Sequence, residues 1–195
     1  LLGKRITLKD RLLLQAWNNS FSTQGLVRLT LNIALITMSL QCIVMIFLTL
    51  YWLNDMGGKQ ALYHALFHVI MAFNSAGFSL HSDSLQSFVG DSFVNIAITF
   101  LIIIGGIGFT VLLDIYQKRR WRTLSLHSKL VLATSAILTV SGFLIIFILE
   151  SLNLATFGQL AFSERLWAAW FQAVTPRSGG FNTIETSFMM TPSLL

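Results

Sequence analysis

The chain has 195 residues, of which 54% are hydrophobic and only 11% are charged, and its mean hydropathy is +0.71. Soluble domains carry about 25% charged residues, so this composition excludes an ordinary soluble protein and indicates an integral membrane protein. A single cysteine, Cys42, excludes a disulfide framework and a cysteine-based metal site. The net charge of +5 comes from basic clusters whose positions fit membrane topology better than nucleic-acid binding.

Residues 1–27 precede the first apolar run and differ from it. The segment Thr7-Leu-Lys-Asp10 resembles a capping box and stands before Leu12-Leu13-Leu14 and Trp17. This pattern predicts a short amphipathic helix in a cytoplasmic segment, lying at the membrane surface or against a partner. The chain also begins without an initiator Met or a signal peptide, so we expect an internal piece of a larger protein.

Three apolar runs are long enough to span a membrane, at residues 29–53, 93–115 and 130–149. At about 1.5 Å per residue, each run approaches or exceeds a hydrocarbon core of ~30 Å. Two further helical stretches, residues 60–73 and 164–174, are shorter. The first of these would be about 20 Å long, so it can enter a membrane without reaching the far face.

Each short stretch ends in a similar glycine loop. Phe73-Asn-Ser-Ala-Gly-Phe78 follows the first, and Thr175-Pro-Arg-Ser-Gly-Gly-Phe181 follows the second. A half-length helix points the negative end of its dipole into the membrane, and an extended loop after it offers carbonyl oxygens to a dehydrated ion. A tight turn between two helices is the alternative for either loop. The repetition in the same context favours an ion pathway.

The charged residues divide into two groups along the chain. Basic residues cluster before the first apolar run and in residues 118–129, whereas most acidic residues lie in the other connections. By the positive-inside rule, the basic clusters are cytoplasmic and both glycine loops open to the outside. We expect Asp114, close to Lys118 and Arg119, to be an interfacial ion-pair partner.

The order of span, half-helix, Gly-Phe loop and span resembles the Trk/Ktr/HKT superfamily of potassium transporters, and within it the bacterial KtrB branch. The likeness is carried by the two glycine loops, Ile104-Gly-Gly-Ile-Gly-Phe109, Gln24-Gly-Leu-Val-Arg28 and His127-Ser-Lys129. It implies an all-α integral membrane protein with pore-loop repeats (span, half-helix, filter loop, span), as in potassium channels. It also implies a cytoplasmic segment at 1–27, the second pore-loop repeat at 28–116, a basic cytoplasmic loop at 117–128 and a partial third repeat at 129–195.

The resemblance further implies that backbone carbonyls of the two loops bind K⁺. Gly77 and Gly180 match the single filter glycine that each repeat of the family contributes. The implied filter strands are Asn74, Ser75, Ala76, Gly77, Arg177, Ser178, Gly179 and Gly180, and the implied support comes from Phe78, Phe181 and Arg177.

The function implied by the resemblance is ion translocation in a potassium uptake system of a prokaryotic plasma membrane. No catalytic residue and no covalent cofactor is expected; K⁺ is the transported ion and Na⁺ is a candidate coupling ion. The implied partners are a second copy of the subunit, forming a homodimer, a cytosolic nucleotide-binding regulatory ring of the KtrA type, and the lipid bilayer; nucleic acid is not expected. A transporter of another monovalent cation such as Na⁺, and a non-conducting structural subunit, stay as alternatives.

Two features of the spans and loops have competing interpretations. Gly105, Gly106 and Gly108 could form a helix hinge or a site of close packing between helices, and packing is favoured. Arg177 is expected to pair with one of the acidic residues near the outer side and so hold the shape of its loop. Alternatively it repels other cations at the mouth. The candidate acids are Glu150, Glu164 and Glu185.

The polar residues around the first loop suggest two further chemistries. His64 and His68 share a helix face at a spacing that a metal could use, but no third ligand is evident, so polar groups of a pore helix are favoured. Ser79, His81 and Asp83 suggest an intramembrane serine protease. That alternative is disfavoured because the three alternate on one short segment and no Gly-x-Ser-x-Gly elbow is present.

Overall fold

The computed structural model describes residues 26–177 and 179–194, and the regular secondary structure of this part is entirely helical. The amphipathic helix predicted in residues 1–27 therefore lies almost wholly outside the described residues, as does the filter position Ser178. The chain divides into two compact units, residues 1–40 and 41–195, and each is treated by itself. The described part of the first unit is the amino-terminal half of helix α2.

Among the described residues, two helices are each long and apolar enough to cross a membrane. Helix α2 (Leu26–Met56) has 31 residues and α6 (Leu126–Glu150) has 25; the apolar part of α2 begins at Thr30. At about 1.5 Å per residue, both exceed a hydrocarbon core of ~30 Å. Ser125 caps α6, since its hydroxyl oxygen accepts the Ser128 N–H at 3.2 Å. The runs predicted at residues 29–53 and 130–149 are confirmed as helices of spanning length.

Two other helices are half as long. Helix α3 (Gly58–Phe73) has 16 residues and α7 (Phe162–Val174) has 13, so they are about 24 and 20 Å long. Glu164 caps α7 by accepting the Ala161 N–H at 2.9 Å. Both helices bury alanines, which allow neighbouring backbones to approach closely: Ala61, Ala65 and Ala72 in α3, Ala168, Ala169 and Ala173 in α7.

The second predicted run, residues 93–115, forms two helices that are separated at one of its glycines. Helix α4 (Ser92–Ile107) ends at Gly108, and α5 (Phe109–Lys118) begins directly after it. The two helices are bent by 96°. Gly108 has a φ of +90°, a conformation open to glycine and strained for residues with a Cβ. The pair is either a broken span or a re-entrant loop.

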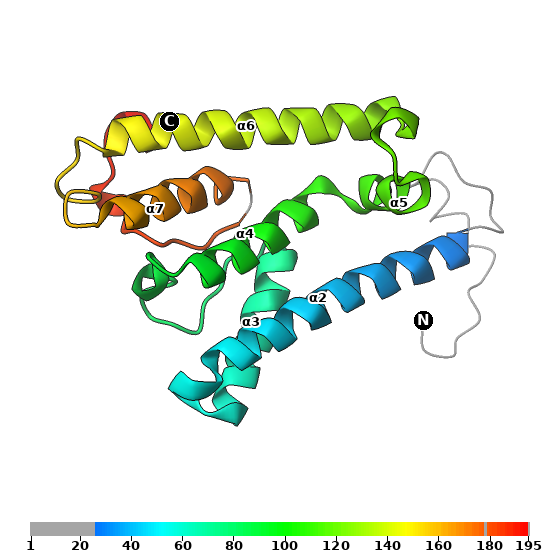
Figure 1. The fold of residues 1–195 in the computed structure, drawn as a ribbon, viewed down its shortest axis with the longest axis horizontal. Coiled ribbons are helices and arrows are strands. Elements are labelled where there is room, and N and C mark those ends of the chain that lie inside the picture. Colours follow the sequence, from blue (N-terminus) through cyan, green and yellow to red (C-terminus); the bar gives the residue numbers. More distant parts are fainter. Residues whose placement is uncertain (1–25, 178, 195) are drawn as a thin grey trace. The chain divides into compact units, whose positions relative to one another are not determined.

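In the second unit, α4 contacts both half-length helices. Helix α3 packs along α4, and α7 lies between α4 and α6, side by side with the latter (Figure 1). The indole N–H of Trp170 in α7 donates to the Thr99 hydroxyl of α4 at 3.1 Å. An apolar core between α6, α7 and the loops that flank α7 contains Ile146, Phe157, Ala168, Ala169, Ala173 and Ile184. The short helices of the connections are η1 (Gln86–Phe88), η2 (Trp121–Thr123), η3 (Thr186–Phe188) and α8 (Thr191–Leu194).

Candidate functional site

The first glycine loop leaves α3 through a tight turn. The backbone N–H and the side-chain amide of Asn74 both donate to the Ile70 carbonyl, at 3.1 and 2.9 Å. The Ala76 N–H donates to the Met71 carbonyl at 2.9 Å. Ser75 has a φ of +54°, which is uncommon for a residue with a side chain and often marks a functional turn. These bonds tie residues 74–76 to the end of α3.

The second loop leaves α7 in a similar way. The Gly179 N–H donates to the Thr175 carbonyl at 2.8 Å, and the Thr175 hydroxyl donates to the Phe181 carbonyl at 2.9 Å. Phe181 is fully buried, and its ring lies 6.1 Å from that of His68 in α3. Phe78, its counterpart in the first loop, is instead 68% exposed. The two phenylalanines predicted as filter support thus lie in different environments.

The loops meet at Gly77 and Gly180. Both glycines have positive φ, +70° and +71°, in the region that residues with a Cβ avoid. A Cβ on Gly77 would lie 2.5 Å from the Cα of Gly180, and a Cβ on Gly180 would lie 2.6 Å from the Cα of Gly77. Ordinary contacts between carbon atoms are ~3.5–4.0 Å, so neither position has room for a side chain. The carboxyl ends of α3 and α7 therefore converge on one place.

At this meeting point, the carbonyl oxygens accept no hydrogen bond from another described residue. No donor among the described residues reaches the carbonyl oxygens of the residues predicted as filter strands. Backbone carbonyls must find a partner when they leave bulk water, and here the available partners are water and a cation. The residues are Asn74, Ser75, Ala76 and Gly77 in the first loop, and Arg177, Gly179 and Gly180 in the second.

Arg177 pairs with hydroxyls of α6, which corrects the expectation of an acidic partner. One guanidinium nitrogen donates to the Thr139 hydroxyl at 3.0 Å and to the Ser135 carbonyl at 3.3 Å. The other donates to the Ser135 hydroxyl at 2.7 Å. Ser135 and Thr139 lie one turn apart on an otherwise apolar spanning helix. Two hydroxyl residues four positions apart in an apolar run are the sequence signal for this contact, and the prediction of an acidic partner overlooked them.

The three candidate acids have other partners. Glu150 is fully buried and accepts from the Thr156 hydroxyl at 2.5 Å and the Met190 N–H at 2.9 Å. Glu164 caps α7, and Glu185 accepts from the Ser187 hydroxyl at 3.0 Å. Glu150 therefore ties the end of α6 to the chain that follows the second glycine loop.

The three glycines of α4 and its end are not equivalent. A Cβ on Gly105 would collide with the carbonyl oxygen of Phe73 at the end of α3, whereas on Gly106 the nearest atom is the Arg177 carbonyl oxygen at 4.0 Å. Gly105 thus lets α4 pack against the first loop, as the packing interpretation expects. Gly108 lies instead at the bend, so the hinge interpretation fits that residue alone.

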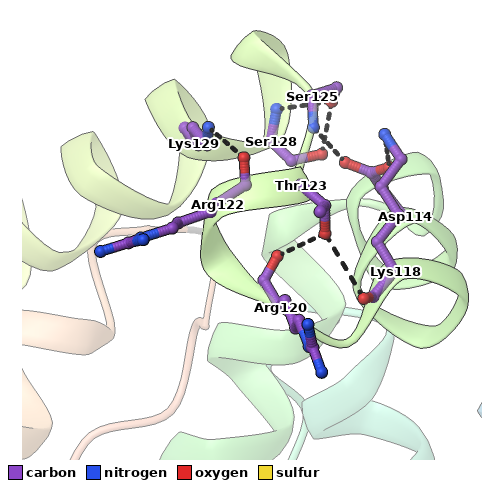
Figure 2. Close-up of polar contacts among 8 residues, drawn as sticks. All are labelled: Asp114, Lys118, Arg120, Arg122, Thr123, Ser125, Ser128 and Lys129. Atoms are coloured by element: carbon purple, nitrogen blue, oxygen red, sulfur yellow. Dashed lines mark hydrogen bonds and ion pairs between the residues drawn. The ribbon is translucent and has the colours of Figure 1, made fainter.

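The basic loop between α5 and α6 is held by hydrogen bonds around Asp114 (Figure 2). Asp114 pairs with Lys118 at 2.6 Å and accepts the Ser125 N–H at 2.8 Å. The Lys129 ammonium donates to the Arg122 carbonyl at 3.1 Å. The predicted ion pair of Asp114 is confirmed, with Lys118 as its partner. The guanidinium of Arg119 lies over the Tyr116 ring, at 5.9 Å from its centroid.

The residues suggested for a protease do not form a relay. Asp83 accepts from the backbone and hydroxyl of Ser87, at 3.1 and 2.5 Å, and this hydroxyl lowers the pKa of Asp83. The Ser79 hydroxyl faces His68, at 3.0 Å from Nε2, and not the His81 ring. A Ser-His-Asp relay needs the carboxylate on the same imidazole that faces the serine. In the described part of the chain, no group of three His, Cys, Asp or Glu residues is arranged to hold a metal ion.

Comparison with known proteins gives a family and several relatives. The family model TrkH, described as a cation transport protein, matches residues 20–193. The chain is 45% identical over 189 residues to the Ktr system potassium uptake protein B of Bacillus subtilis. It is 35% identical to the protein of the same name from Vibrio alginolyticus and 31% identical to the potassium/sodium uptake protein NtpJ of Enterococcus hirae.

These matches cover nearly all of this chain but less than half of each relative. The aligned part is 97% of the chain and 42% of the Bacillus protein, and 40% of the Enterococcus protein. The predicted resemblance to Trk/Ktr transporters, and to KtrB among them, is confirmed. The matched family transports cations and is not a family of enzymes, and the apolar helices and bacterial relatives support a prokaryotic membrane protein. The chain belongs to the TrkH family of cation transport proteins.

Proposed function

We propose that this chain is part of the ion-translocating subunit of a potassium uptake system and carries two of the strands of its selectivity filter. The observation that supports this most strongly is the backbone contact between Gly77 and Gly180, each within a few residues of the carboxyl end of a half-length helix. Two segments that are far apart in the chain bring the same motif, with the same positive φ, to one point.

The chemistry of that point suits a dehydrated cation. The carboxyl end of each half-helix carries about half a negative charge, and α3 and α7 both direct that end to the glycine contact. The free carbonyl oxygens of the two loops can replace the water around K⁺. Arg177 helps to hold the second loop, because its guanidinium is bound to α6. The positive charge of this residue also discourages other cations from resting beside the loop.

The pore-loop architecture follows from this assignment. In it, residues 28–116 form the second repeat, residues 117–128 a basic cytoplasmic loop and residues 129–195 part of the third repeat. The basic loop and the amino-terminal segment face the cytoplasm, and the glycine loops open to the outside of the plasma membrane. Membrane potential then drives K⁺ inward with about 2.3 kcal/mol per charge per 100 mV.

The proposed partners follow from the family and from the names of its bacterial relatives. The Bacillus and Vibrio relatives are named as components of a Ktr system, which supports a multi-component assembly with a nucleotide-binding regulatory ring and a homodimer of this subunit. The Enterococcus relative is named a potassium/sodium uptake protein. That name supports Na⁺ as a coupling ion and keeps a less selective monovalent cation transporter as the second candidate.

Complementation of a potassium-uptake-deficient bacterial strain by the full-length protein tests the proposal. We expect growth at low K⁺ with the unaltered protein and loss of growth with Gly77→Ser and with Gly180→Ser. Gly57→Ser is the matched control, since Gly57 has a φ of +76° but nothing within 4 Å of an added Cβ. Failure of the unaltered protein to rescue growth, or full growth with both filter substitutions, would contradict the proposal.

A further inference from the structure

The two glycine loops are also joined at a second place, beyond Gly77 and Gly180 along the chain. The Leu85 N–H donates to the Asn182 carbonyl at 2.9 Å. The Asn182 N–H in turn donates to the Ser84 hydroxyl oxygen at 3.0 Å, between segments 98 positions apart. Asn182 follows Gly180 by two residues, so this pair of bonds acts directly on the end of the second loop.

Ser84 is placed for these bonds by an unusual backbone. Its φ is +60°, an energetically costly conformation for a residue with a side chain. Such a cost persists only where surrounding contacts compensate for it, and it often marks a functional turn. Here the positive φ accompanies three bonds at one turn: the Ser84 hydroxyl accepts from Asn182, its carbonyl faces Ser79, and the next residue donates to Asn182.

Ser79 connects this turn to the first half-helix. Its hydroxyl oxygen accepts the His81 N–H at 3.0 Å, and it lies 3.0 Å from both the Ser84 carbonyl oxygen and His68 Nε2. His68 is fully buried in α3, and its Nδ1 lies 2.8 Å from the His64 carbonyl oxygen. Because His68 Nδ1 must donate to the His64 carbonyl, Nε2 of the neutral imidazole is an acceptor, and the single Ser79 proton goes either to the Ser84 carbonyl or to His68 Nε2.

We infer that Ser79 and Ser84 are positioning residues that hold the two glycine loops in register and so set the ion preference of the filter. The inference rests on the proposed function. Free carbonyls can discriminate between ions of different size only if the two loops keep their separation. The contact between the two glycines is a van der Waals contact, which does not fix the orientation of one loop relative to the other. The bond from Ser79 to the Ser84 carbonyl and the bonds that join Ser84 and Leu85 to Asn182 supply that direction. They link the chain that leaves the first loop to the segment that follows the second filter glycine.

The test compares K⁺ and Na⁺ uptake by the full-length protein in vesicles, together with the amount of folded protein. We expect Ser79→Ala and Ser84→Gly to lower the K⁺/Na⁺ ratio by up to about tenfold, the size expected for loss of a partly buried hydrogen bond. Ser84→Gly also relieves the positive φ, so its folding is not compromised by backbone strain. Ser79→Thr keeps the hydroxyl and should keep the ratio.

Ser82→Ala is the matched control, because Ser82 lies in the same loop and its side chain is exposed. An unchanged ion ratio in Ser79→Ala and Ser84→Gly, with a collapsed ratio in Gly77→Ser, overturns the inference and leaves the proposed function standing. An unchanged ratio in the glycine variants as well overturns the proposed function. If Ser79→Ala does not fold, the Ser84→Gly variant is the test. Reduced uptake by Ser84→Gly at an unchanged K⁺/Na⁺ ratio would contradict the inference.

Discussion

The contact between Gly77 and Gly180 predicts that substitutions at these two positions are coupled. In Gly77→Ala, the new Cβ would lie 2.5 Å from the Cα of Gly180. Because carbon atoms at contact are ~3.5–4.0 Å apart, the loops must separate by about 1 Å. Overpacking of that kind costs about 1–3 kcal/mol, and the positive φ adds about 1–2 kcal/mol. Each single substitution should therefore destabilise the protein by about 2–5 kcal/mol.

The double substitution should cost less than the sum of the two single ones. Once the loops have separated for the first Cβ, the second needs no further separation, so the shared part of about 1–3 kcal/mol is counted once. Gly57→Ala isolates the cost of positive φ, because its Cβ would meet nothing within 4 Å. The assay is the apparent Tm of the full-length protein in detergent for Gly77→Ala, Gly180→Ala, the double variant and Gly57→Ala. Additive shifts, or single shifts no larger than that of Gly57→Ala, would refute the reasoning.

Three further substitutions have expected outcomes. Arg177→Lys keeps the charge but loses the forked contacts to α6, so ion preference should change as well as uptake rate in a vesicle flux assay; an unchanged preference would show that only the charge matters. Glu150→Ala leaves buried donors without an acceptor and should lower stability by about 3 kcal/mol, visible as a lower apparent Tm. Gly105→Ala should lower the Tm because its Cβ meets the Phe73 carbonyl, whereas Gly106→Ala, which has more room, should leave the Tm unchanged or raise it slightly; equal effects of the two would contradict this packing.

The lengths of the elements could be predicted from the sequence because they follow from uninterrupted apolar runs. Residues 60–73 and 164–174 were too short to span, and they are the half-length helices α3 and α7. The position of the break at Gly108 could not be predicted from the apolar pattern as the element lengths could. A glycine inside an apolar run is compatible with a straight, closely packed helix or with a bend, and the choice depends on what packs against it. In the structure Gly105 serves packing while Gly108, with φ at +90°, lies at the 96° bend.

The partners of polar side chains were harder to predict than the elements. Arg177 was expected to pair with an acid, because a charge in a membrane protein needs compensation. The sequence offers three nearby acids and no direction for the side chain, and the structure directs it to Ser135 and Thr139 of α6 instead. The bond between Ser84 and Asn182 joins segments 98 positions apart, and a local sequence pattern cannot predict a contact between such distant residues.

The position of the ion tests the central proposal most directly. Crystals of the full-length protein grown with Rb⁺ in place of K⁺ would locate the ion by its anomalous scattering. We predict a peak in direct contact with the carbonyl oxygens of Gly77 and Gly180, at the carboxyl ends of α3 and α7. A bound Rb⁺ elsewhere along the pathway, with none at these carbonyls, would contradict the assignment of the two loops as filter strands.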